Sequence, residues 1–146
     1  MANYEFADHR LVKSLDARIG EIMKGVAGGF LGTLTEASSE SVRQRAPSSR
    51  IAFVNRAEDE ANDLGNCGSG ETCDLAVPLA CYTCWKFEPW IEAPHRRLLE
   101  QLTAERARRT AAHLHPRIVA VQDRAIEAVA EVVEKIEQIR TAKERP

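Results

Sequence analysis

The chain has 146 residues, a formal net charge of −2 and 29% charged residues. This balance excludes a protein that its overall charge draws to nucleic acid, so any DNA contact has to be local. A chain of this length builds one modest core, which predicts a single domain over residues 1–146. No secretory signal and no transmembrane run is recognisable, which predicts a cytoplasmic protein without membrane contact.

Residues 1–34 are predicted to form an N-terminal helix and a glycine-rich turn. Apolar side chains repeat at helical spacing within 8–24, and Asp8 precedes them as an N-cap. They are Leu11, Val12, Leu15, Ile19, Ile22 and Met23. Glycines at 25, 28, 29 and 32 then end the helix. The polar, serine-rich residues 35–50 are predicted to form a surface loop.

Residues 51–95 combine a short apolar run with a cysteine-rich block. The run IAFV at 51–54 has strand character and allows a small β-hairpin with the residues before the first cysteine. All four cysteines follow within one block and are spaced C-x5-C-x7-C-x2-C. They are Cys67, Cys73, Cys81 and Cys84. Both tryptophans lie in the same block, so Trp85, Phe87 and Trp90 are expected to pack around the thiols.

Three interpretations of the four thiols remain open. The C-x2-C pair, Cys81 and Cys84, suits adjacent corners of a structural zinc site, and the other pair would complete the tetrahedron. A [4Fe-4S] cluster is the alternative, because it also takes four thiolates and tolerates irregular spacing. Two disulfides or four unconnected buried thiols are the third interpretation, and a reducing cytoplasm disfavours the disulfides. His95, soon after the block, is an alternative ligand in place of one cysteine.

Residues 95–146 are predicted to form a long antiparallel helical hairpin, which makes the expected fold mostly α with a metal-stapled loop. The first helix starts beside Pro94 and ends near Pro116. It carries a basic side that is the candidate for DNA contact. The arginines are Arg96, Arg97, Arg106, Arg108 and Arg109. The second helix, 117–141, has a heptad seam and is longer than the first can cover, which predicts a homodimer or a contact with another protomer through it.

Several motifs together resemble a known family. The motifs LGNCG (64–68), PLACYTC (78–84), FEPW (87–90) and APH (93–95) resemble a segment near the C-terminus of bacterial phage-integrase-like tyrosine recombinases. The stretch VQDRAIEAVAEVV (121–133) is similar to the tail helix of that family. The resemblance implies an accessory C-terminal domain that supports DNA integration and recombination, with the catalytic core of the recombinase as its partner.

The same resemblance implies a role for Tyr4. The opening NYEFADHRLVKSLD is similar to the family's stretch that begins at its nucleophilic tyrosine. The arginines, histidine and lysine that activate the phosphate in that family have no counterpart in this chain, and a phenol without them is a poor nucleophile. The chain is therefore expected to hold no complete active site. The alternative function is a free-standing helical module that binds zinc or an iron–sulfur cluster and dimerises.

Overall fold

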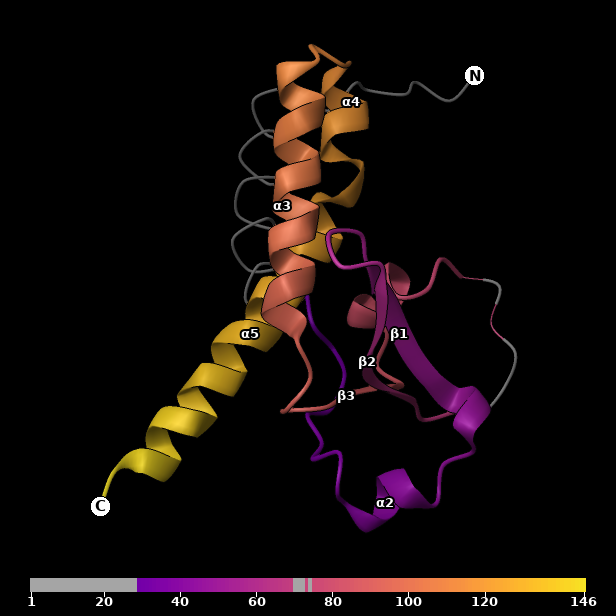
Figure 1. Cartoon of the computed structure of the whole chain (residues 1–146), viewed down its shortest axis with the longest axis vertical. Helices are drawn as coiled ribbons and strands as arrows, with labels where there is room; N and C mark the ends of the chain where they lie inside the picture. The colour runs from indigo at the N-terminus through magenta and orange to yellow at the C-terminus, as the bar shows by residue number, and fades with distance from the viewer. Residues whose placement is uncertain (1–28, 70–72, 74) are drawn as a thin grey trace, which may run out of the picture.

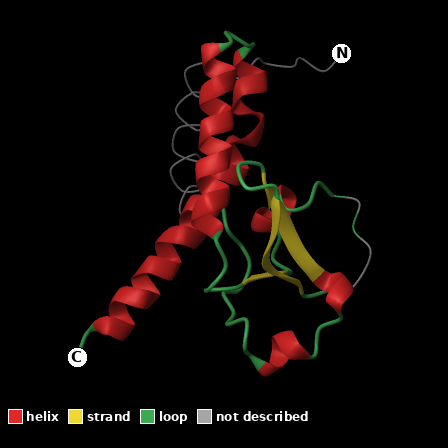
Figure 2. Ribbon diagram, viewed as in Figure 1, coloured by secondary structure: helices red, strands yellow, loops and turns green. Residues whose placement is uncertain are grey.

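The computed structural model describes residues 29–69, 73 and 75–146, and Tyr4 and the predicted N-terminal helix lie outside them. In chain order its elements are α2 (Glu40–Arg43), the 3-10 helix η1 (Pro47–Ser49), β1 (Arg50–Asn55), β2 (Glu60–Cys67), the 3-10 helix η2 (Leu79–Thr83), β3 (Phe87–Pro89), α3 (His95–Ala111), α4 (Pro116–Val119), the 3-10 helix η3 (Ala120–Gln122) and α5 (Asp123–Glu144). A small sheet lies on one side of the molecule, and α3, α4 and α5 lie on the other (Figures 1 and 2).

The three strands form one antiparallel sheet in the order β1-β2-β3. In β1, Ile51 and Phe53 are buried while Val54 is exposed, as expected for a strand with one face on the core. The β1–β2 register shifts between Ile51 and Ala52, and β2 then pairs with β3 from Gly65 opposite Pro89 to Cys67 opposite Phe87. Gly65 and Asn66 are therefore paired on both sides, and Cys67 is paired with β3.

The outer edge of β3 is covered by the chain segment that precedes α2. Thr33 N–H donates to Phe87 O at 3.1 Å, and Thr35 N–H donates to Pro89 O at 2.9 Å. Ile91 N–H returns a bond to Thr35 O at 2.9 Å. A strand of three residues is too short to be stable alone, so these bonds and those to β2 explain why it forms.

The core joins the sheet to two helices. Buried apolar side chains of α3 and α5 pack with those of the strands and of η2. From the helices they are Leu98, Leu102, Ala128, Val129, Val132 and Ile136, and from the rest of the chain Phe30, Ile51, Phe53, Leu64, Tyr82 and Phe87. Burial of this apolar surface is the main stabilising contribution to the fold.

The predicted fold class is wrong. The described chain contains a three-stranded antiparallel sheet beside its helices, and the allowed hairpin is part of that sheet. The predicted metal-stapled loop is replaced by backbone pairing of β2 with β3 and by the turn of η2, which hold most of the described cysteine block. The stretch 35–50, predicted as a loop, contains α2 and η1.

The prediction of a long helical hairpin is also wrong. After Pro116 the chain forms α4, η3 and α5 in place of one continuous helix, because Gln122 leaves helical geometry with φ −107° and ψ 4°. In Figure 1, α4 lies beside α3, whereas α5 runs past the beginning of α3. Within the described residues, no helix has both the length and the apolar character needed to cross a bilayer.

Candidate metal centre

The structure brings all four predicted thiols to the border of one cavity. Cys67 ends β2, Cys73 lies in the following segment, Cys81 belongs to η2 and Cys84 is the C-cap of η2. All four line a cavity of about 240 Å³, and no disulfide joins them. In the parts of the chain that the structure describes, no three His, Cys, Asp or Glu side chains already lie close enough to hold one ion.

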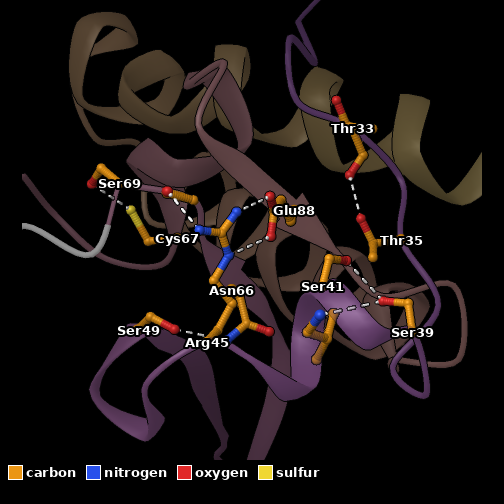
Figure 3. A network of polar contacts seen from close by, with 12 residues as sticks. Thr33, Thr35, Ser39, Ser41, Arg45, Ser49, Asn66, Cys67, Ser69 and Glu88 are labelled. Carbon is orange, nitrogen blue, oxygen red and sulfur yellow. Dashed lines mark hydrogen bonds and ion pairs between the residues drawn. The ribbon is translucent and has the colours of Figure 1, made fainter.

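Arg45 fixes the end of β2 beside Cys67. Its guanidinium donates to Glu88 Oε1 at 2.7 Å and Oε2 at 3.3 Å, and to Gly68 O at 3.0 Å. Figure 3 shows this guanidinium between the Glu88 carboxylate and the backbone next to Cys67. A bidentate arginine–carboxylate pair adds geometric precision as well as energy. The backbone that carries Cys67 is therefore held by β3 and by a side chain from the α2–η1 connection.

Tyr82 fixes η2, which carries the other thiol pair. Cys84 N–H donates to Cys81 O at 2.9 Å, so the two thiols stand on one turn. Between them Tyr82 is fully buried, with its hydroxyl 2.6 Å from His95 Nδ1. His95 Nε2 lies 2.8 Å from Trp90 O. Because a carbonyl oxygen can only accept, Nε2 carries the proton and Nδ1 accepts from Tyr82.

Because of this network, His95 is not available as a metal ligand. Both of its ring nitrogens are engaged, and its side chain is 1% exposed. Burial lowers the pKa of His95 to about 4, the bond to Trp90 O opposes that shift, and the charge of Arg140 adds to it. His95 is therefore neutral at pH 7 and acts as a structural link between η2 and the start of α3.

The thiol of Cys81 must release its proton before the sulfur can bind a metal ion. Burial, together with the nearby thiols of Cys67, Cys73 and Cys84, raises its pKa to about 11. At pH 7 this thiol keeps its proton until a cation takes its place. Metal binding at this cavity is therefore expected to release protons and to weaken as the pH falls.

The aromatic residues of the block differ in their roles. Phe87 lines the cavity and is buried, with its ring 5.0 Å from that of Tyr82. Trp90 donates from Nε1 to Asn66 Oδ1 at 2.9 Å and so braces β2. Trp85 is 71% exposed, and the expectation that it packs around the thiols is wrong.

All five arginines predicted to contact DNA have acidic partners. The pairs are Arg96 with Glu137, Arg97 with Glu58, Arg106 with Asp123, and Arg108 and Arg109 with Glu105. These pairs tie α3 to the β1–β2 turn, to α5 and to itself, and they balance most of the local positive charge. Exposed pairs of this kind contribute little stability each. Contact of this side of α3 with DNA stays a prediction.

No protein family, curated protein or solved structure matches this chain. The chemistry of the site is therefore inferred from its donors. Thiolates are soft ligands that select zinc, copper(I) and iron–sulfur clusters over hard cations such as Mg²⁺. Sequence patterns did not reveal the braces around the thiols, because the Arg45–Glu88 pair spans 43 residues and the Tyr82–His95 pair spans 13.

Proposed function

We propose that this chain binds one metal centre, zinc or a [4Fe-4S] cluster, through Cys67, Cys73, Cys81 and Cys84. The observation that supports this best is the convergence of four thiols from β2, η2 and the segment between them on one cavity. In a reducing cytoplasm, four clustered cysteines serve a metal more often than they form disulfides. The centre would occupy a preformed pocket, since β-pairing and the Tyr82–His95 bond hold the surrounding backbone without it.

We expect purified protein to contain near-stoichiometric zinc or iron, and Cys81→Ser to lose it. A serine hydroxyl does not replace a thiolate on a soft metal, whereas the backbone bonds of η2 remain. Elemental analysis measures the metal, and circular dichroism checks that the fold persists. Thr83→Ser, between the same two cysteines, is the matched control and should keep the metal. Wild-type protein that carries neither metal, even after reconstitution, would contradict the proposal.

The resemblance of the cysteine motifs to phage-integrase-like recombinases supports a specific setting for this centre. We propose that the chain is a cytoplasmic accessory domain that supports DNA integration by contacting a recombinase catalytic core, another protomer or DNA. The proposed homodimer through the C-terminal helix has less support, because Ile136 is 5% exposed within one chain and Ile139 is half-buried. A recombinase catalytic domain encoded directly upstream would distinguish this setting from a free-standing module.

If α3 contacts DNA, replacing its two most exposed arginines will weaken binding. The side chains of Arg96 and Arg108 are 60% and 62% exposed. In the double variant Arg96→Gln, Arg108→Gln, the negative slope of log K against log salt should become shallower by about 1.8, or about 0.9 for each lost phosphate contact. Fluorescence anisotropy on a duplex at several salt concentrations measures this slope.

The matched control removes the same charge from the end of α5. Lys143→Gln, Arg145→Gln should leave the slope unchanged if the contact is local to α3. Equal losses in both double variants would indicate an effect of net charge alone. No binding by the wild type would show that the arginines serve the ion pairs described above and not DNA.

A further inference from the structure

We infer that the cavity holds a [4Fe-4S] cluster and not a single zinc ion. The inference rests on the proposed metal-binding function and specifies its cofactor. It follows from three features of the cysteine cavity: its size, the anchoring of the backbone around it and the character of its walls.

The size of the cavity exceeds that of a single-ion site. In a tetrahedral zinc site each sulfur lies about 2.3 Å from the ion, which places neighbouring sulfurs about 3.8 Å apart and leaves no space between them. Here four thiols border an open cavity of about 240 Å³, which also extends along residues 48–51. One water molecule occupies roughly 30 Å³ in the liquid, so this space suits a body of several atoms. A [4Fe-4S] cube has eight core atoms and takes one cysteine at each iron, so its ligands are spread around it.

The anchoring of the backbone opposes collapse of the thiols onto one ion. Cys67 is paired with Phe87 across β2 and β3, and the next residue, Gly68, donates from its N–H to Lys86 O at 2.7 Å. Cys81 and Cys84 are on η2, whose Tyr82 is fixed in the core. The backbone at these three cysteines is therefore fixed, and only rotation of their side chains can change the distances between their sulfurs. Cys73 is exposed and outside regular structure, so it can adjust as the fourth ligand.

The walls of the cavity suit a cluster that water would degrade. Apart from the thiols, the buried lining includes the apolar Ile51 and Phe87, while Leu75 and Val77 form an apolar rim that is exposed to solvent. An apolar shell limits solvent access to a metal centre and sets its potential. A structural zinc site, closed by its four thiolates, has less need of such walls.

The test is anaerobic purification of the full chain, with iron, acid-labile sulfide and zinc measured on the same sample. We expect about four iron and about four sulfide per chain. We also expect a broad visible absorption that bleaches when dithionite supplies an electron. In Cys73→Ser, iron should fall from about four to about three or fewer per chain, because one iron loses its thiolate. Cys73 lies outside the core, so this variant keeps the fold. The control Leu75→Ser changes the same rim without removing a ligand and should retain iron.

The outcomes distinguish failure of the cluster inference from failure of the proposed metal-binding function. Iron and sulfide that depend on Cys73 support both. One zinc per chain without sulfide, in protein that also fails to form a cluster from ferrous iron and sulfide, overturns the cluster and leaves the metal-binding function standing. Neither metal before or after reconstitution overturns both. Iron that Cys73→Ser retains in full overturns ligation by all four thiols.

Discussion

Acidification from pH 6.5 to pH 4 will lower the free energy of unfolding by about 3 kcal/mol through His95 alone. Burial lowers the pKa of His95 from 6.5 to about 4, so the folded protein leaves the ring neutral in this range while the unfolded chain protonates it. The contribution of the neutral His95 ring to stability is fully present above pH 6.5 and is lost as the pH falls towards 4. Protonation in the fold would also remove the acceptor at Nδ1 that Tyr82 uses.

Urea unfolding at several pH values from 6.5 down to 4.5 measures about 2 kcal/mol of this loss, and the NMR titration of the His95 ring measures its pKa directly. Above pH 4.5 the carboxylates of Glu105 and Glu131 contribute little, because the fold lowers the pKa of each. The Arg108 bond is the main cause at Glu105, and the bonds from Phe30 N–H and Lys135 outweigh burial at Glu131. His95→Gln removes the titrating ring, and its stability should change much less over this range. A His95 ring that titrates near 6.5 in the folded protein would contradict the prediction.

Gly65→Ala will lower the free energy of unfolding by about 3 kcal/mol, the upper part of the usual range for overpacking. A Cβ at Gly65 would lie 2.3 Å from Glu88 O and 2.7 Å from Pro89 Cα. Both atoms belong to the backbone of β3, which the bonds from Thr33 and Thr35 hold from its other side. The strand therefore cannot move away without losing pairing on one of its edges.

Thermal unfolding followed by circular dichroism provides the measurement, with an expected fall in midpoint of roughly 10 °C. Gly68→Ala is the matched control at the end of the same strand. There the nearest atom, Lys86 O, would be 3.0 Å from the new Cβ, so a small shift relieves the contact. We expect a loss of about 1 kcal/mol or less in the control. Equal effects of the two substitutions would show that β3 can move and that the close approach at Gly65 is not limiting.

Local patterns in the sequence correctly predicted part of this structure. The apolar run at 51–54 lies in β1, and the amphipathic stretch after Pro94 begins α3 at His95. The convergence of the cysteines was also expected from their clustering. The shape of their cavity was not, because spacing along the chain says nothing about how far apart anchored segments stand.

The errors arose where long-range contacts decide the structure. β3 is Phe-Glu-Pro, which no strand pattern would select, and it forms because it has partners on both edges. The heptad over 117–141 indicated one helix, since the break at η3 falls on Ala-Val-Gln without a glycine or proline to mark it. The mixed sheet-and-helix fold therefore depends on pairings that single-sequence periodicity does not encode.

The bond from Phe30 N–H to Glu131 Oε2 joins residues 101 positions apart at 3.0 Å. During synthesis, all three strands, with Phe30 and Phe87, therefore leave the ribosome well before α5, the helix that covers these side chains. During that interval α5 is missing and the apolar side of the sheet is open to water and to other nascent chains. Contacts of such sequence separation slow the folding of small domains. Truncation within α5 should therefore yield a chain that aggregates during synthesis, even though every strand and all four cysteines are present.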